Sequence, residues 1–330
     1  MKDEKKITIQ PLLNSINKEK AKDLFTKPAT FTFIAFVVLC IFMGVISDTF
    51  FEIGNINNIL RQISVNAIIS IGMTMVILTG GIDLSVGPVM ALSSTFMAGA
   101  MLSGVNPVIA VIIGLLTGLV FGFLNGILIS YGKQPAFIVT LAMMEIARGI
   151  ALLYTGGYPL SGLPKSFGFI GKGSVLGIQT PVLLMIILYI VAYFILNKFV
   201  FGRYVYSIGG NEEASRLSGI KVKKYKLMVY VFSGLTAAAS SLILTSRLMS
   251  GQPNAGVGFE LDSIAAVVLG GTDMSGGRGH IFGTLLGALM LGVLNNGLNL
   301  MGVSPYMQRV VKGMIIIAAI FLSSKRETKK

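Results

Sequence analysis

The stretch PVIAVIIGLLTGLVFGFLNGILIS, from Pro107 to Ser130, decides the class of fold, because it contains no charged residue. The hydrocarbon core of a bilayer is about 30 Å thick, and roughly 20 apolar residues in a helix can cross it. Glycines recur at every fourth position and share one face of the expected helix: Gly114, Gly118, Gly122 and Gly126. Small residues let helices approach closely in a membrane, so we expect this face to pack against a neighbouring helix.

The rest of the chain has the same character. Of its 330 residues, 53% are hydrophobic and 12% are charged, whereas soluble domains carry about 25% charged residues. We therefore predict an all-α integral membrane protein with about ten transmembrane helices. The candidate spans are residues 29–47, 63–80, 86–104, 107–130, 135–154, 180–199, 226–248, 260–271, 279–298 and 307–323. The eighth is the weakest, because it is short and opens with Glu260 and Asp262.

The positive charges predict the orientation. Lys and Arg concentrate in the cytoplasmic loops of membrane proteins, and most of the 27 in this chain fall on one side of the expected spans. We therefore predict both termini in the cytoplasm, with an N-terminal segment at 1–28, a transmembrane domain at 29–323 and a tail at 324–330. This topology accounts for the net charge of +13, so we expect no nucleic-acid partner.

The composition excludes several kinds of site. The lone cysteine, Cys40, rules out an intrachain disulfide framework, and the lone histidine, His280, argues against a histidine-based metal site. The chain also lacks the G-x-x-x-x-G-K-[ST] loop that cradles nucleotide phosphates. We expect no catalytic residues, metal or cofactor on this chain, and we expect any ATP hydrolysis on another protein.

Two short motifs, one in each half of the chain, resemble each other. They are Gly80-Gly81-Ile82-Asp83-Leu84-Ser85 and Gly270-Gly271-Thr272-Asp273-Met274-Ser275. Paired motifs of this kind can mark an internal duplication and the transport region. Asp and Ser also suit helix N-caps, where a side-chain oxygen accepts a free backbone N–H, so a structural role is an equal alternative. The predicted topology places both motifs on the cytoplasmic side.

Polar residues within the spans are candidates for the translocation path. Ionisable groups at membrane depth are costly and often functional, and Glu145 is the main acid in mid-span. Arg148 follows it three positions later, so the two could instead form an ion pair on one helix face. The amide candidates are Asn66, Asn125, Asn295 and Asn296. Hydrogen bonds between helices would explain these amides equally well.

The loop at about 200–225 predicts a short cytoplasmic helix. Asn211 is a good N-cap, and Glu212 and Glu213 suit the positive end of a helix dipole. Gly219 is a suitable residue for the end of this helix. A basic loop that only sets the topology would not need a capped helix.

Six motifs occur in order along the chain and carry a family resemblance. They are Ser64-Val65-Asn66-Ala67, residues 80–87, Gly202-Arg203-Tyr204, Gly209-Gly210-Asn211-Glu212, residues 260–271 and residues 294–300. With Glu213-Ala214 and Gly219, they resemble the permease subunits of bacterial ATP-binding-cassette importers of monosaccharides. The resemblance extends from about residue 50 to 322.

The resemblance implies a homodimer in the bacterial plasma membrane, surrounded by lipid and bound to a cytoplasmic ATPase subunit that carries the ATP. It also implies an extracytoplasmic sugar-binding protein as a partner. Asn211, Glu212, Glu213, Ala214 and Gly219 would form the coupling helix that docks on the ATPase. The chain has Glu-Glu-Ala where the wider class has Glu-Ala-Ala, which leaves the docking residues open.

We therefore expect a permease that is not an enzyme, with ribose as the expected sugar. Another monosaccharide, a furanose signal molecule or a nucleoside would suit the same family. An ion-coupled secondary sugar transporter is the alternative from another class, although such proteins keep ionisable residues in the path. Loss of uptake on removal of the ATPase would exclude this alternative.

Overall fold

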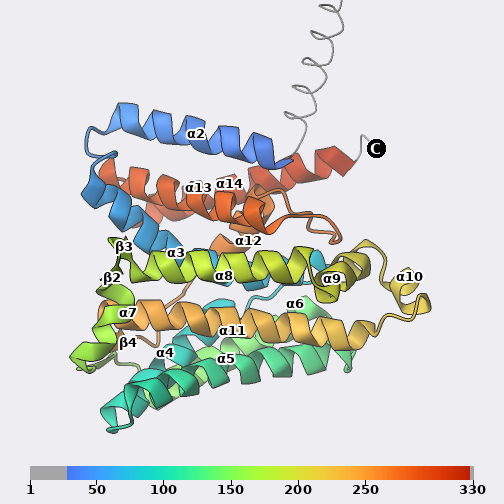
Figure 1. The fold of residues 1–330 in the computed structure, drawn as a ribbon, viewed down its shortest axis with the longest axis horizontal. Helices are drawn as coiled ribbons and strands as arrows, with labels where there is room; N and C mark the ends of the chain where they lie inside the picture. The colour runs from blue at the N-terminus through green and yellow to red at the C-terminus, as the bar shows by residue number, and fades with distance from the viewer. Residues whose placement is uncertain (1–27, 328–330) are drawn as a thin grey trace, which may run out of the picture.

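The computed structural model describes residues 28–327, so the predicted N-terminal segment lies almost wholly outside the described residues, as do the last three residues of the tail. The long helices are α2 Pro28–Ile46, α3 Ile53–Leu78, α4 Val86–Leu102, α5 Pro107–Ser130, α6 Ala136–Thr155, α8 Thr180–Asn197, α11 Val222–Leu248, α13 Ile281–Leu300 and α14 Pro305–Glu327. Shorter helices are η1 Lys165–Gly168, α7 Phe169–Lys172, α9 Val200–Gly210, α10 Glu212–Leu217 and α12 Phe259–Leu269. The helices lie side by side in a bundle (Figure 1).

Each predicted span coincides with one of these helices, so the prediction of an all-α membrane protein is confirmed. Within residues 28–327, six helices are long and apolar enough to cross a membrane, and they are α3, α5, α6, α8, α11 and α13. Two apolar helical segments are shorter: residues Thr32–Ile46 of α2, and α4 itself. The 11 residues of α12 cover only about 16 Å at 1.5 Å per residue, roughly half the hydrocarbon core. The number of crossings therefore stays a prediction.

Helix α3 forms the core of the bundle. From Ile63 to Leu78 every residue except Asn66 is buried, because α11, α12, α13 and α8 surround this helix. α3 begins ten residues before the predicted span at 63, since its first turns carry Asn55, Asn58 and Arg61. Those polar side chains are compatible with a helix, but they lower the local hydropathy, so a hydropathy-based prediction places the start of the span too late.

The glycine face of α5 packs along α11, as its spacing predicts. A Cβ atom added to Gly118 would collide with the carbonyl oxygen of Gly234, and one added to Gly122 would collide with the carbonyl oxygen of Tyr230. The opposite face of α5 exposes large apolar side chains, including Val108 and Ile109. The packing role of these glycines is confirmed.

The two ends of the bundle differ. At the left in Figure 1, α7 lies with two antiparallel strand pairs: β1 Leu160–Ser161 with β4 Ser250–Gly251, and β2 Ser174–Val175 with β3 Ile178–Gln179. At the right lie α9, α10 and the turn between α12 and α13. The chain thus places its basic loop and both glycine motifs at one end.

Candidate functional site

The predicted helix of the basic loop is confirmed as α10. Asn211 is extended, with φ −161° and ψ 105°, and its side-chain oxygen accepts a hydrogen bond from the Ala214 N–H at 2.9 Å. Glu212 and Glu213 occupy the first turn. Gly219 has φ +83°, the left-handed conformation that commonly follows a helix.

One face of α10 is held by the rest of the protein and the other is free. Ser215 is buried, and its hydroxyl pairs with that of Ser207 on α9 at 2.8 Å. Glu212 forms an ion pair with Lys226 of α11 at 3.0 Å. Leu217 is 74% exposed at the edge of the molecule, where α10 lies in Figure 1. An exposed leucine on a helix that is fixed to α9 and α11 by its other side chains is suited to contact with another protein.

Glu213 and Arg216 form an exposed pair on this helix. The Arg216 Nη2 to Glu213 Oε1 distance is 2.5 Å. The hydrogen bond from Arg216 lowers the pKa of the Glu213 carboxyl. The pair therefore stays ionised at neutral pH, and it gives the outer face of α10 one charge of each sign.

α9 joins α10 to the bundle through a contact that we call the glycine junction, formed by Gly80, Gly209, Gly276 and Gly277. A Cβ atom on Gly209 would collide with the Leu78 carbonyl oxygen and the Gly277 nitrogen. The Gly277 N–H donates to that same carbonyl at 2.9 Å. A Cβ atom on Gly276 would lie 2.9 Å from the Gly80 nitrogen. The ends of α3 and α9 and the turn before α13 are therefore in direct backbone contact.

The two glycine motifs form similar turns at this end. Gly80 (φ +74°) follows α3 and Gly271 (φ +85°) follows α12, both left-handed. The Asp83 Oδ1 atom accepts from the Ser85 N–H at 3.0 Å, and Asp273 Oδ1 accepts from the Ser275 N–H at 2.9 Å. The two motifs were predicted to lie on the same side of the membrane domain, and in the structure they lie at the same end of the bundle. The internal duplication stays a prediction.

The N-cap alternative holds only for the position of Ser85, which is the N-cap residue of α4. Ser85 precedes α4, but its hydroxyl donates to Asp83 Oδ1 at 2.6 Å and caps no backbone N–H. In the second motif, Gly270 ends α12, and Asp273 and Ser275 lie well before Ile281, where α13 begins. The carboxylates organise the turns themselves.

Asp83 is the centre of a buried polar network. Only 1% of its surface is exposed, and its Oδ2 atom accepts from the Ser233 hydroxyl of α11 at 2.7 Å. The Asn125 amide of α5 donates to the Ser85 hydroxyl at 2.9 Å. Asn125, a predicted path residue, is therefore bonded to the turn before α4, and Ser233 bonds the same turn to α11.

Two other predicted path residues, Asn296 and Glu145, do not line the cavity that is described below. Asn296 of α13 and Asn55 of α3 exchange two amide hydrogen bonds, at 3.0 and 2.7 Å. Glu145 is exposed on α6. The pairing of Glu145 with Arg148 is not among the ion pairs of residues 28–327, because Arg148 donates to the carbonyl oxygens of Pro253 and Ala255 instead.

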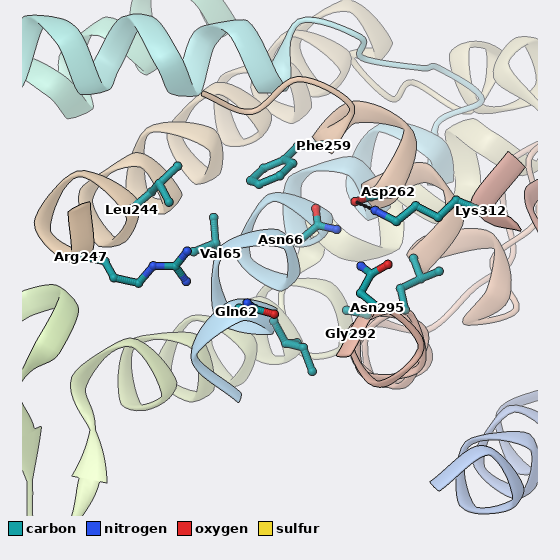
Figure 2. Close-up of a pocket in the computed structure, with 13 residues that line it drawn as sticks. Gln62, Val65, Asn66, Leu244, Arg247, Phe259, Asp262, Gly292, Asn295 and Lys312 are labelled. Atoms are coloured by element: carbon teal, nitrogen blue, oxygen red, sulfur yellow. Dashed lines mark hydrogen bonds and ion pairs between the residues drawn. The ribbon is translucent and has the colours of Figure 1, made fainter. Parts of the chain in front are cut away.

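The remaining two path candidates, Asn66 and Asn295, line one cavity of about 220 Å³. Five helices form its wall: α3, α11, α12, α13 and α14. Figure 2 shows the side chains that converge on it. The polar ones are Gln62, Asn66, Arg247, Asp262, Asn295 and Lys312, and Phe259 contributes a ring.

The wall of this cavity combines apolar side chains with polar ones, and its charged groups are two cations and one carboxylate. Lys312 of α14 and Asp262 of α12 form an ion pair at 2.9 Å. The Oδ1 atoms of Asn66 and Asn295 are buried and have no hydrogen-bond partner. The site therefore offers hydrogen-bonding groups and one guanidinium, that of Arg247, in the space between the helices.

A comparison with protein families identifies the class of transporter. Residues 55–320 match the family described as branched-chain amino acid transport system / permease component. The chain belongs to this permease family. This permease is 51% identical to the ribose import permease protein of Bacillus subtilis (strain 168), over 89% of this chain and 92% of the relative.

Further relatives cover similar lengths. The permease is 48% identical to the ribose import permease protein of Escherichia coli (strain K12), over 89% of this chain and 93% of the relative. It is 39% identical to the D-allose transport system permease protein of the same strain, over 88% and 89%. No solved structure matches the permease. The relatives are transport components, and the permease is accordingly a membrane transport protein rather than an enzyme.

Most of the cavity wall is not predicted from the sequence. Arg247, Phe259 and Lys312 are not among the predicted path residues, and Asp262 enters the prediction only as a charge that weakens the eighth span. A usable signal was present, since Asp262 and Lys312 are opposite charges within two apolar segments. Charges at membrane depth pair with each other, so each could have predicted the other.

Proposed function

We propose that this permease is the membrane subunit of an ATP-driven importer that carries ribose. The relatives in Bacillus subtilis and Escherichia coli, whose names specify ribose, support this proposal through about half-identical sequences that match along nearly the whole of each chain. The structural observation on which this proposal depends is α10. It is a capped helix that is hydrogen-bonded to α9 on its inner side and exposed on its outer side.

In this proposal, α10 is the coupling helix and docks on a separate ATPase subunit that binds the ATP. The basic end of the bundle faces the cytoplasm with both termini, and the end with the strand pairs receives the sugar-binding protein. The chain crosses a bacterial plasma membrane about ten times and forms a homodimer. The exposed apolar face of α5 suits contact with lipid or a second copy.

The test is uptake of radiolabelled ribose by proteoliposomes that contain the permease and its ATPase, with the binding protein added outside. We expect uptake that needs internal ATP and stops when the ATPase carries a substitution in its phosphate-binding loop. Uptake that continues with the defective ATPase would support an ion-coupled secondary transporter instead.

The same vesicles test the sugar. The permease is 39% identical to a D-allose permease and 34% identical to a xylose permease of Haemophilus influenzae, so allose and xylose are the relevant competitors. We expect unlabelled ribose to inhibit uptake at the lowest concentration. Stronger inhibition by another sugar would retain the importer and change its substrate.

A further inference from the structure

We propose that the cavity between α3, α11, α12, α13 and α14 binds one neutral monosaccharide inside each copy of the chain. This inference rests on the proposed function, and it adds a binding site that the coupling helix and the family do not specify. The site would hold the sugar by contacts with Asn66, Asn295 and Phe259, after the binding protein releases it.

The unpartnered atoms of the wall indicate the chemistry of the ligand. Asn66 Oδ1 and Asn295 Oδ1 are hydrogen-bond acceptors, and both are buried without a donor. A buried polar atom without a partner is destabilising, so such atoms indicate a missing ligand or water. A sugar hydroxyl can donate to these oxygens, whereas a group without hydrogen, such as a carboxylate or a sulfate, cannot.

The charged groups of the wall are compatible with a hydroxylated ligand. Asp262 and Lys312 neutralise each other at 2.9 Å, and the guanidinium of Arg247 can donate hydrogen bonds to hydroxyl oxygens. Phe259 is half-buried, and its ring lies beside Asn66 in Figure 2. A ring with amide groups nearby suits a sugar, which has an apolar C–H face and polar hydroxyls. The volume of about 220 Å³ lies below the roughly 300–1,000 Å³ of pockets for drug-sized ligands, as expected for a single pentose.

The position of the cavity suits a site filled before the cytoplasmic side opens. Its residues lie near the helix ends farthest from α10: Arg247 at the end of α11, Phe259 at the start of α12 and Asn295 in the last third of α13. The glycine junction lies at the other ends of α3 and α12. Sugar binding and ATPase docking would therefore act on opposite ends of the same helices.

The first experiment measures binding to the full chain, purified in nanodiscs without its partners. Binding of tritiated ribose is measured for the native chain, Asn66→Leu and Asn58→Leu. Leucine has the same number and branching of heavy atoms as asparagine but cannot accept a hydrogen bond. Because Asn66 Oδ1 has no protein partner, the substitution should leave thermal stability unchanged or improved. Asn58 is an exposed asparagine on the same helix and serves as the matched control.

We expect saturable binding to the native chain and to Asn58→Leu, and affinity that is lower by roughly three- to tenfold in Asn66→Leu, the effect of one lost hydrogen bond. Equal binding by Asn66→Leu and the native chain would overturn the assignment. Tighter competition by ribose 5-phosphate than by ribose would overturn the neutral class of ligand.

A second measurement locates the sugar in the cavity. The chain contains no tryptophan, so Phe259→Trp introduces a single fluorescent reporter. We expect a saturable fluorescence change with ribose, which is absent from Phe282→Trp, whose parent side chain is 58% exposed on α13. No response of Phe259→Trp to ribose, in a variant that unfolds at the same temperature as the native chain, would overturn the site. ATP-driven ribose uptake by the native importer tests the proposed function separately, and it would persist if only the cavity assignment were false.

Discussion

Replacement of Gly209 by alanine is expected to separate ATP hydrolysis from sugar uptake. The added Cβ atom would collide with the Leu78 carbonyl oxygen and with the Gly277 nitrogen, and both of these atoms belong to backbone that cannot rotate away. α9 would have to move off the end of α3. Because α10 follows α9 directly, the coupling helix would lose its fixed connection to the bundle.

The magnitude follows from two effects. Overpacking of a close contact is destabilising by about 1–3 kcal/mol. The Gly277 to Leu78 hydrogen bond, 2.9 Å long, contributes about 0.5–1.5 kcal/mol and would be lost as the backbones separate. Together they shift the equilibrium of the glycine junction by about 2–4 kcal/mol, or roughly 30- to 1,000-fold. The free energy of unfolding of a typical domain is larger, at about 5–15 kcal/mol, so the permease should remain folded.

Gly210→Ala is the matched control. Gly210 is the next residue of α9, and no atom lies within 4 Å of a Cβ atom added there. Alanine is also the better helix former, by about 1 kcal/mol. In proteoliposomes with the ATPase and the binding protein, we expect native uptake from Gly210→Ala and at least tenfold slower uptake from Gly209→Ala, with ATP hydrolysis retained in both. Equal uptake by the two variants would refute the role of the junction.

Three other substitutions test separate contacts. Asp83→Ala should lower the free energy of unfolding by about 2–4 kcal/mol, because two buried serine hydroxyls lose their acceptor, and Asp83→Asn should restore most of it in thermal unfolding in detergent. Gly219→Pro should leave membrane insertion normal but abolish co-purification of the ATPase, since φ +83° cannot be adopted by proline; an intact complex would contradict the docking role of α10. Gly122→Leu should reduce the yield of folded protein because it collides with α11, whereas Gly149→Leu, in open space, should not; equal yields would argue against the packing role.

The sequence predicted best those features that depend on local chemistry. Apolar length located the helices, and the residue types at 211–219 located α10 with its cap. The glycine spacing predicted the packing face of α5 correctly. These features need only the preferences of a single helix or turn.

The site depended on contacts between distant segments, which hydropathy does not report. Asn66 and Asn296 look equivalent in sequence, yet one faces a cavity and the other is paired with Asn55. The sequence spacing suggests Arg148 as the partner of Glu145, but Arg148 donates hydrogen bonds to two carbonyl oxygens of the loop after β4 instead. Rotation of a helix by one or two positions decides such outcomes, and only the packed bundle sets this rotation.

The short length of α12 has a consequence for membrane insertion. The segment 249–258 continues from α11 to α12 without forming a helix, and its Pro253 and Ala255 carbonyl oxygens are satisfied by Arg148 of α6. Non-helical backbone is tolerated at membrane depth only where protein or water satisfies its polar groups. Residues 249–269 are therefore poorly suited to leave the translocon as an independent hydrophobic helix. We expect them to settle only after α6 is in place, so that the biogenesis of this half of the protein depends on a helix synthesised about a hundred residues earlier.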